Sequence, residues 1–593
     1  MKDLIEQLKD IYIKKFCKYN KEQRNNINIL YNNYKDNSIY GDINININSI
    51  FFLKKKNKNK LGIKLGNKIK KKLKKYVYKY ELKSNYLNIF LKKKYYINKI
   101  KKFIKSNFNI QKTIYNKKNK KKRYIIEFSS PNSNKPLHLG HLRNILIGNT
   151  IANIYNVIGF NVIKSQLIND RGIHICKSII AFKKFFNKKI KLNIKGDHFV
   201  GILYFKFEKE FQKEIKLISK KYNIKKNQAI KYSRLSKLVN NELINWEKKK
   251  GESISIWKKI NKLVYKGFSI TYKKLNVKFD DILYESKTYL LGKNFILEGL
   301  KKKIFFLDKD KSVYFLYKKK KIILLRNNGT SLYITQEIGT LLYRIKKYKK
   351  FNLLIYVVGN EQINHFKVLF EIIKINKLLI YNKLYHLSYN TVNFLGKKIK
   401  SRYIKKNEFI FIDDLICIMN NYVKHKIKKK KSDKIVEQIS LGAIKYQFIK
   451  INPKKKIDFN INNVLKIKGN TGIYIQYTYA RIYSILKKNN LKKIKFYKTN
   501  FLKLIKKNEI SIIRLILEYK TIIDRIIKKY DPSILTNYIY IISKKINNFY
   551  QKNKILNIKN IYKRNLRLII CKIILNFLYF NMKILGIPIL KKI

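Results

Sequence analysis

Apolar residues in the middle of the chain change from strand-like runs to helical spacing and back. Residues 124–128 form a short, mostly apolar run of strand length that a Ser-Ser-Pro sequence interrupts. Between residues 139 and 158 apolar side chains recur at intervals of three and four, which predicts a helix. Gly159 can adopt the left-handed backbone conformation that commonly ends a helix. Residues 161–168 then predict a second strand. This order predicts a βαβ unit, with a site at the carboxyl end of a parallel sheet.

The C-terminal part of the chain, from about residue 469, has a strongly helical pattern. A three-to-four period predicts a helix that Pro532 ends, with apolar positions Ile512, Ile516, Tyr519, Ile523, Ile526 and Tyr530. An all-α bundle there would offer basic and aromatic surface on which RNA bases can stack. The first 115 residues form a lysine-rich segment of mixed pattern, followed by a linker at about 113–123.

The length of the chain limits the number of domains, and its charge suggests a kind of partner, but neither decides the function. At 593 residues the chain has room for about three or four domains. A formal net charge of +101 ordinarily indicates a polyanionic partner. Lysine, isoleucine, asparagine and tyrosine are abundant everywhere, however, including inside the predicted helices and strands. The charge by itself therefore does not establish RNA binding, and the inference depends on motifs.

Cysteine spacing and hydropathy indicate the compartment. The four cysteines lie far apart with no C-x-x-C pair, so they predict neither a zinc ribbon nor a disulfide framework. The sequence has no apolar run of membrane-spanning length and no signal-peptide pattern at its start. We therefore expect a soluble protein of the reducing cytoplasm. The common phosphate-loop and dinucleotide-binding fingerprints are absent from the sequence.

One block of fifteen residues constrains the chemistry most tightly. Residues 127–141 read E-F-S-S-P-N-S-N-K-P-L-H-L-G-H, at the point where the predicted strand leads into the predicted helix. His138 and His141 therefore lie at a helix N-terminus, where free N–H groups and the helix dipole favour an anion. Two imidazoles there could donate to the charge that develops on a phosphorus under attack. The block predicts nucleotide chemistry.

These residues resemble a known family. His138-Leu139-Gly140-His141 resembles the HIGH motif of class I aminoacyl-tRNA synthetases, and the surrounding block resembles its arginyl-tRNA synthetase version. Further matches follow in the family's order, at residues 167–172, 333–339, 356–362 with His365, 469–472, 475–482 and 585–587. The resemblance spans nearly the whole chain and is thinnest before residue 124 and between residues 483 and 580.

The resemblance implies a fold and a division into domains. The fold class is α/β, a Rossmann-like class I synthetase catalytic domain with an N-terminal α+β domain and a C-terminal all-α anticodon-binding bundle. The implied regions are a tRNA-elbow-binding domain at residues 1–115, a catalytic domain at 124–414 with an insertion at about 190–290, a connecting helical region at 415–468, and the anticodon-binding domain at 469–593.

The resemblance also implies a pocket for an arginine side chain. A guanidinium is always charged and is best held by a bidentate carboxylate, so such a pocket needs acids. By resemblance the arginine-binding residues are Glu127, Ser130, Asn132, Tyr333, Glu337 and Gln362. Glu337 departs from the family, which usually has aspartate at this position, and its additional methylene has to be accommodated.

A second motif carries lysines. Lys398-Ile399-Lys400-Ser401-Arg402 resembles a degenerate copy of the class I KMSKS motif, although the usual glycine does not follow it. Its ammonium groups would neutralise the triphosphate as pyrophosphate departs. In family members with degenerate second motifs, a lysine at the position of Lys135 often shares this role. The implied catalytic residues are therefore His138, His141, Lys135 and Lys398, with Leu139, Gly140, Lys400 and Ser401 at ATP.

Together these features predict an arginyl-tRNA synthetase, a ligase that uses ATP to activate L-arginine and transfers it to the 3′ end of its tRNA. We expect Mg²⁺ to accompany ATP, with no metal held by the protein itself, a monomeric enzyme, and activation that needs bound tRNA. One alternative is a non-catalytic tRNA-binding paralogue, which the intact His138, Gly140 and His141 disfavour. The other is a class I synthetase for another amino acid, which Glu127 and Asn132 disfavour together with Tyr333.

Overall fold

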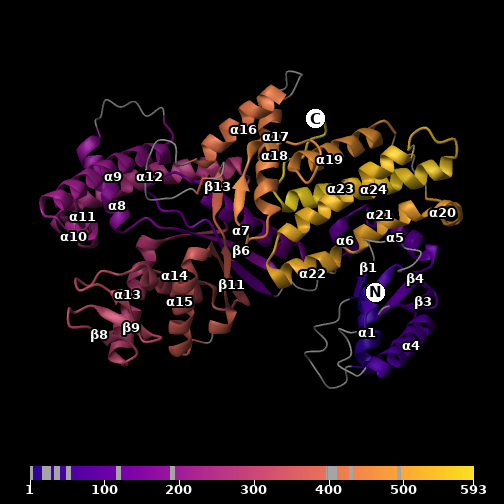
Figure 1. Ribbon diagram of the computed structural model, residues 1–593, viewed down its shortest axis with the longest axis horizontal. Coiled ribbons are helices and arrows are strands. Elements are labelled where there is room, and N and C mark those ends of the chain that lie inside the picture. The colour runs from indigo at the N-terminus through magenta and orange to yellow at the C-terminus, as the bar shows by residue number, and fades with distance from the viewer. Residues whose placement is uncertain are drawn as a thin grey trace.

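A parallel sheet lies at the middle of the molecule, between a helical insertion at one end and the C-terminal helices at the other (Figure 1). The computed structural model describes residues 4–16, 29–31, 41–47, 55–83, 85–114, 122–186, 194–378, 380–394, 397–398, 410–426, 432–489, 496–553 and 555–592. The N-terminal elements lie beside the C-terminal helices, away from the insertion. None of the helices within these ranges is long and apolar enough to cross a membrane.

The central sheet has the strand order of a doubly wound nucleotide-binding fold. Its five strands are all parallel and run in the order β12-β11-β5-β6-β7. Their bounds are Arg123–Glu127 (β5), Asn161–Ile168 (β6), Asp281–Tyr284 (β7), Leu353–Gly359 (β11) and Leu384–Tyr389 (β12). The strand order reverses between β5 and β11, and ligands of such sheets bind at the carboxyl ends beside that point. The predicted strand at 161–168 is confirmed, and the strand predicted at 124–128 lies one residue earlier.

Helices cover both faces of this sheet because its strands are apolar on both sides. They are α7 (Leu139–Val157), α8 (Ile173–Phe185), α13 (Glu285–Lys301), α14 (Tyr333–Tyr348) and α15 (Ile363–Ile375), with short 3₁₀ turns at Asn360–Gln362 (η1) and Tyr381–Lys383 (η2). The predicted helix after residue 139 is confirmed as α7, and Gly159 has the expected positive φ of 91°.

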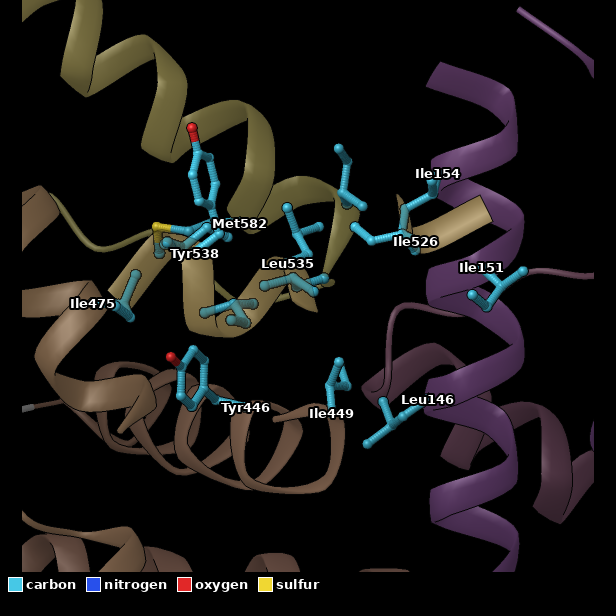
Figure 2. Close-up of a cluster of buried hydrophobic side chains, with 14 of the residues drawn as sticks. Leu146, Ile151, Ile154, Tyr446, Ile449, Ile475, Ile526, Leu535, Tyr538 and Met582 are labelled. Carbon is cyan, nitrogen blue, oxygen red and sulfur yellow. The ribbon is translucent and has the colours of Figure 1, made fainter. Parts of the chain in front are cut away.

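Helix α7 is buried on nearly every side, so it belongs to two packing layers at once. Its buried side chains include Leu146, Ile151 and Ile154. In Figure 2 these three side chains point toward Ile449 of α17 (Asp433–Ile449) and Ile526 of α22 (Tyr519–Lys529). The helix that bears the two histidines therefore shares one hydrophobic core with the C-terminal helices.

Two smaller units interrupt the sheet. The insertion consists of α9 (Gly196–Lys221), α10 (Lys226–Tyr232), α11 (Arg234–Glu247) and α12 (Gly251–Lys274). An antiparallel sheet of three strands follows α13, with β8 (Phe306–Leu307), β9 (Val313–Tyr317) and β10 (Lys320–Leu325). Strand β7 lies inside the range predicted for the insertion, yet it pairs with β6, so the catalytic sheet already resumes there.

A third small sheet links the catalytic region to the helices that follow. Its strands run in the order β14-β13-β15, with β13 at Val392–Phe394, β14 at Lys397–Lys398 and β15 at Ile457–Phe459. The helices of this region are α16 (Ile412–Lys426), α17 and α18 (Ile461–Val464). Because β13 follows directly after β12, this small sheet begins at the edge of the central sheet.

The C-terminal region is all-α, as predicted. Besides α22 its helices are α19 (Gly472–Lys487), α20 (Lys498–Leu504), α21 (Lys507–Leu517), α23 (Ser533–Lys552) and α24 (Ile561–Ile584). The predicted single helix before Pro532 is wrong in one respect, since it is divided into α21 and α22 at Glu518. The apolar period does not reveal this break because Glu518 keeps right-handed helical φ and ψ of −68° and −15°. The helix ends at Tyr530, which has a left-handed φ of 52°.

The N-terminal region is α+β, as predicted. Its antiparallel sheet has the order β1-β2-β4-β3. The elements are α1 (Leu4–Phe16), β1 (Ile29–Tyr31), β2 (Ile43–Asn46), α4 (Lys55–Lys72), β3 (Val77–Lys83), β4 (Tyr86–Leu91), α5 (Lys93–Lys105) and α6 (Ile110–Ile114). Arg514 of α21 forms an ion pair of 2.5 Å with Asp42, which joins this region to the C-terminal helices. The exact domain boundaries stay predictions.

Candidate active site

The turn after β5 is held in place by two side chains from other elements. Ser129 has a left-handed φ of 57°, which is uncommon for a residue with a side chain. Its N–H donates to Asn144 Oδ1 at 2.6 Å, and its hydroxyl bonds the Tyr272 hydroxyl at 2.7 Å. Asn144 Nδ2 in turn donates to the Val357 carbonyl of β11 at 2.6 Å. Asn144 thus fixes the turn at the switch point of the sheet.

His138 and His141 cap the N-terminus of α7. Gly140 N–H donates to His138 Nδ1 at 3.1 Å, and His138 N–H donates to His141 Nδ1 at 3.2 Å. Because each Nδ1 accepts a hydrogen bond, the proton of each neutral imidazole is assigned to Nε2. The ring centroids lie 3.9 Å apart. The two histidines therefore present a pair of Nε2–H donors at the N-terminus of the helix.

Both imidazoles are neutral at physiological pH. Burial lowers the pKa of His141 to about 3, and the positive charge of Lys135 adds to this effect. Burial, His141 and Lys135 together hold the pKa of His138 well below its usual value. Protonation of either ring would place a second positive charge beside that of Lys135, so the histidines act as hydrogen-bond donors and not as charges.

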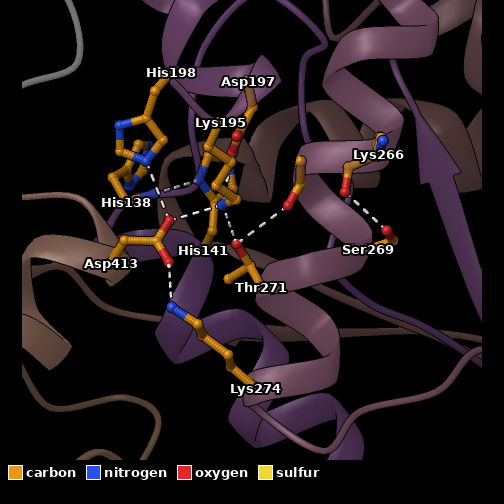
Figure 3. A network of polar contacts seen from close by, with 11 residues as sticks. His138, His141, Lys195, Asp197, His198, Lys266, Ser269, Thr271, Lys274 and Asp413 are labelled. Carbon is orange, nitrogen blue, oxygen red and sulfur yellow. Dashed lines mark hydrogen bonds and ion pairs between the residues drawn. The ribbon is translucent and has the colours of Figure 1, made fainter. Parts of the chain in front are cut away.

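The chain that follows the second lysine motif returns to this turn (Figure 3). Phe411 forms a β-bridge with His138, and Ile412 N–H donates to the Leu137 carbonyl at 2.9 Å. Asp413 then accepts hydrogen bonds from Lys195 at 2.7 Å and His198 at 3.1 Å. Burial alone would raise the pKa of Asp413, but the hydrogen bonds from His198 and Lys195 hold it below its usual value.

Acidic side chains gather around one buried arginine below the turn. Glu127, at the end of β5, forms an ion pair of 2.5 Å with Arg344 of α14, whose side chain is 0% exposed. Glu127 Oε1 also accepts from the Ser130 hydroxyl at 3.2 Å. Tyr333, Glu337 and Arg344 recur along α14 at spacings of four and seven, so they lie on one side of that helix.

Two of the acids are poised to ionise near neutral pH. Burial raises the pKa of Glu337 to about 8, and the negative charge of Glu127 adds to the rise. Burial likewise raises the pKa of Glu285, the first residue of α13, to about 8, with Arg171 opposing the shift. Glu337 Oε2 and Glu285 Oε2 are buried and have no hydrogen-bond partner among the described residues. A cationic ligand would supply the missing donors.

The remaining predicted residues lie around these two groups. Asn132 forms a β-bridge with Asn169 after β6 and is partly buried. Tyr333 is 59% exposed at the start of α14, and Gln362 is exposed in η1 at the end of β11. Lys398 lies on β14, where only its backbone is described, opposite Asn393. Lys400 and Ser401 lie outside the described residues.

Sequence reasoning missed several residues that shape the site. Asn144 is one of four asparagines on α7, with Asn149, Asn153 and Asn156, so no signal marked it as a functional residue. Arg344, Glu285 and Arg143 carried no such signal, because arginines and glutamates at single positions are usually surface residues. Their burial follows only from the tertiary structure.

Among the described residues, one group has the composition of a cation site. It consists of Asp197, His198 and Asp413. Lys195 Nζ already lies 3.1 Å from Asp197 and 2.7 Å from Asp413, so an ammonium group occupies the position a metal would take. This group is an ion-pair network and does not fit Mg²⁺, which prefers a near-octahedral shell of oxygens.

The comparisons with known proteins agree with this geometry. Residues 104–461 match the family of class I tRNA synthetases (R), catalytic domain, and residues 475–593 match the DALR anticodon binding domain. The chain is 36% identical over 526 residues to an arginine–tRNA ligase of Borreliella afzelii, with 86% of each chain covered. It is 38% identical over 530 residues to that of Borrelia turicatae, again with 86% of each covered.

Solved structures share the fold over the whole length. The arginyl-tRNA synthetase of Thermus thermophilus superposes with a TM-score of 0.77 at 18% identity, covering 99% of both chains. That of Plasmodium falciparum gives 0.77 at 22% identity and covers 100% of both.

The doubly wound sheet, the paired histidines and the family matches define a class I aminoacyl-tRNA synthetase. Within that class, the chain belongs to the arginyl-tRNA synthetase family. The sequence prediction of an arginine–tRNA ligase is therefore confirmed, and the alternative of a synthetase for another amino acid is set aside.

Proposed function

We propose that this chain charges an arginine tRNA with the residues that surround the turn after β5. The observation that carries the proposal is the adjacency of two features at the switch point of the sheet. One is the pair of neutral histidines at the N-terminus of α7, and the other is the cluster of buried acids formed by Glu127 and Glu337. A phosphate-binding site beside a guanidinium-binding site suits ATP and arginine.

In the first step, an oxygen of the arginine carboxylate forms a bond to the α-phosphorus of ATP. The bond between that phosphorus and the bridging oxygen of the β-phosphate breaks, and pyrophosphate leaves. The Nε2–H groups of His138 and His141 donate to the oxygens on which charge develops. Leu139 would bring its backbone N–H to the nucleotide, whereas the Gly140 N–H already donates to His138 Nδ1.

Gly140 allows this arrangement because a side chain there would collide with the histidine. A Cβ on Gly140 would lie 2.9 Å from His138 Cε1, closer than such contacts ordinarily come. The lysines complete the site, since Lys135 and Lys398 would neutralise the departing pyrophosphate, with Lys400 and Ser401 at ATP. A hydroxyl of the 3′-terminal ribose of the tRNA then bonds to the carbonyl carbon of the adenylate, the bond from that carbon to the phosphate oxygen breaks, and AMP leaves.

Arginine would lie with its guanidinium toward the acids of β5, α13 and α14. Glu337 and Glu285 offer buried carboxylate oxygens that have no donor among the described residues, while Ser130, Asn132 and Gln362 would orient the α-amino and carboxylate groups. Tyr333 would cover the pocket from the first turn of α14. Glu285 extends the set of six residues that the sequence predicted.

Mg²⁺ would enter as the magnesium complex of ATP, held by the phosphates. The two carboxylates of the group formed by Asp197, His198 and Asp413 already pair with the Lys195 ammonium. We therefore propose no set of protein ligands for the ion. We further propose that the enzyme acts as a monomer in the cytoplasm, with residues 1–115 at the tRNA elbow and residues 469–593 at the anticodon.

The test is aminoacylation of an arginine-accepting tRNA transcript by the purified protein, together with exchange of pyrophosphate into ATP with and without that tRNA. We expect charging with arginine, and exchange that requires the tRNA. Tight tRNA binding without charging at any arginine concentration would instead identify a non-catalytic member of the family.

Arginine affinity is expected to increase with pH up to about 8. Glu337 is largely protonated below its pKa of about 8, and it must ionise to pair with the guanidinium, so binding releases a proton. The dissociation constant for arginine should therefore fall by up to about ten-fold per pH unit between pH 6 and 8 and then level off. Calorimetry in two buffers of different ionisation enthalpy measures both the affinity and the proton release. A constant affinity across this range would contradict the assignment of Glu337.

A further inference from the structure

A buried arginine on the histidine-bearing helix contacts the chain segments that lead to the second lysine motif. Arg143 lies on α7 and is 0% exposed. Its Nη1 donates to the carbonyls of Asn390 at 2.7 Å and Thr391 at 3.1 Å. Its Nη2 donates to three more carbonyls, those of Asn452 at 3.1 Å, Pro453 at 3.2 Å and Lys455 at 2.6 Å. One guanidinium thus joins two segments that are distant in sequence.

These two segments form the base of the small sheet that contains Lys398, the first residue of the second motif. Residues 390–391 lead into β13, and residues 452–455 lead into β15. Asn390 N–H donates to the Pro453 carbonyl at 2.9 Å, and Ile457 N–H donates to the Thr391 carbonyl at 3.1 Å. β13 then pairs with β14, which places the backbone of Lys398 opposite Asn393. A movement of this base would carry β14 with it.

The chain beyond the second motif is attached to the same helix. Phe411 bridges His138, and the Ile412 N–H bonds the Leu137 carbonyl, as described above. The chain on both sides of the motif is therefore fastened to the first turns of α7. Arg143 makes the attachment on the N-terminal side and lies two residues after His141 and five residues after His138.

We infer that Arg143 is a positioning residue that fixes the β13–β14 hairpin, and with it the backbone of Lys398, relative to His138 and His141. The inference rests on the proposed role of Lys398 at the departing pyrophosphate. A guanidinium suits this task because its planar fork reaches several acceptors in fixed directions, whereas an ammonium acts as a compact point charge. Arg143→Lys keeps the charge but cannot span both segments.

A double-mutant cycle tests the inference. We would measure tRNA-dependent pyrophosphate exchange for the wild type, Arg143→Lys, Lys398→Ala and the double variant, each checked by its melting temperature. Misplacement by about 1 Å can cost up to about 10²-fold, so we expect Arg143→Lys to lower kcat at least about ten-fold with the KM for arginine nearly unchanged. In the Lys398→Ala background the same substitution should have little further effect.

Two more variants keep the result interpretable. Asn390→Ala removes a side chain that bonds the Lys454 carbonyl at 3.3 Å across the same base, and it should give a smaller loss of kcat that also disappears without Lys398. Arg123→Lys is the matched control, because Arg123 donates to the Tyr348 carbonyl at 3.1 Å at the opposite end of the sheet and should keep wild-type kcat. If Arg143→Lys does not fold, the Asn390→Ala cycle decides.

The outcomes separate the inference from the proposed function. Full activity of Lys398→Ala would refute the role of Lys398 itself. A strong loss in Lys398→Ala, combined with multiplicative losses in the double variant, would overturn the inference and leave Arg143 as a purely structural residue.

Discussion

Replacing His138 by alanine is expected to lower kcat for arginine activation by about 10²–10³-fold, the usual effect of removing one preorganised donor at a developing charge. His138 presents its Nε2–H because its Nδ1 is engaged by the Gly140 N–H. The KM for arginine should change little, since the acids that would bind the guanidinium lie on β5, α13 and α14 and remain in place. Pyrophosphate exchange at saturating tRNA measures both constants.

The substitution also removes a helix cap. A second variant separates this loss of stability from the loss of the Nε2–H donor. His138 caps α7, and loss of a capping side chain costs about 1 kcal/mol of stability. His138→Asn keeps an acceptor that can cap the helix but lacks the Nε2–H at the same position. We therefore expect His138→Asn to be as inactive as His138→Ala while melting close to the wild-type temperature. Recovery of activity in the asparagine variant would show that capping, and not donation to phosphate, is the function of His138.

The first part of this site was predictable from sequence because it is local. The strand, the turn and the histidine pair lie within residues 123–141, where periodicity and turn residues determine the backbone. The family resemblance implied a Rossmann-like sheet, but the order of its strands was not predicted. The environment of the histidines, including the attachment of Phe411 to His138, depends on segments far along the chain and had no local signal.

The buried charged residues show more clearly what could not be predicted from the sequence. The sequence predicted that Glu127 would bind a substrate guanidinium, but it could not show that a guanidinium of the protein, Arg344, already pairs with it at 2.5 Å. In a chain with 136 lysines and arginines, a single buried arginine cannot be recognised from composition. The same holds for Arg143, which is buried against backbone carbonyls that have no sequence signature.

This pairing changes which acid is expected to hold the substrate. Glu127 Oε2 faces Arg344 and Oε1 faces the Ser130 hydroxyl, whereas Glu337 Oε2 is buried without a hydrogen-bond partner among the described residues. We therefore expect Glu337 to accept the guanidinium of the substrate directly, with Glu127 keeping Arg344 neutralised beside it.

Glu337→Gln is accordingly expected to raise the dissociation constant for arginine by about 30-fold or more, since truncating one partner of a buried, hydrogen-bonded charge pair costs about 2–5 kcal/mol. The fold should survive because the ion pair between Glu127 and Arg344 remains. The increase of affinity with pH should also become shallower, because Glu337 can no longer ionise and Glu285, whose pKa is likewise about 8, is the acid that still does. Calorimetric titration with arginine at pH 6 and 8 measures both effects.

Two further substitutions at the same acids make the result specific. Glu337→Asp restores the residue usual in the family and should retain most of the affinity, since the charge remains and only one methylene is lost. Glu127→Gln should instead destabilise the fold, because breaking a buried ion pair leaves the Arg344 guanidinium uncompensated at a cost of up to about 3–5 kcal/mol. Ionisation of Glu337 can offset part of that cost, because loss of the neighbouring negative charge lowers the pKa of Glu337 toward its usual value. If Glu337→Gln binds arginine as tightly as the wild type and Glu127→Gln does not, the roles of the two acids are reversed and Arg344 must move when arginine binds.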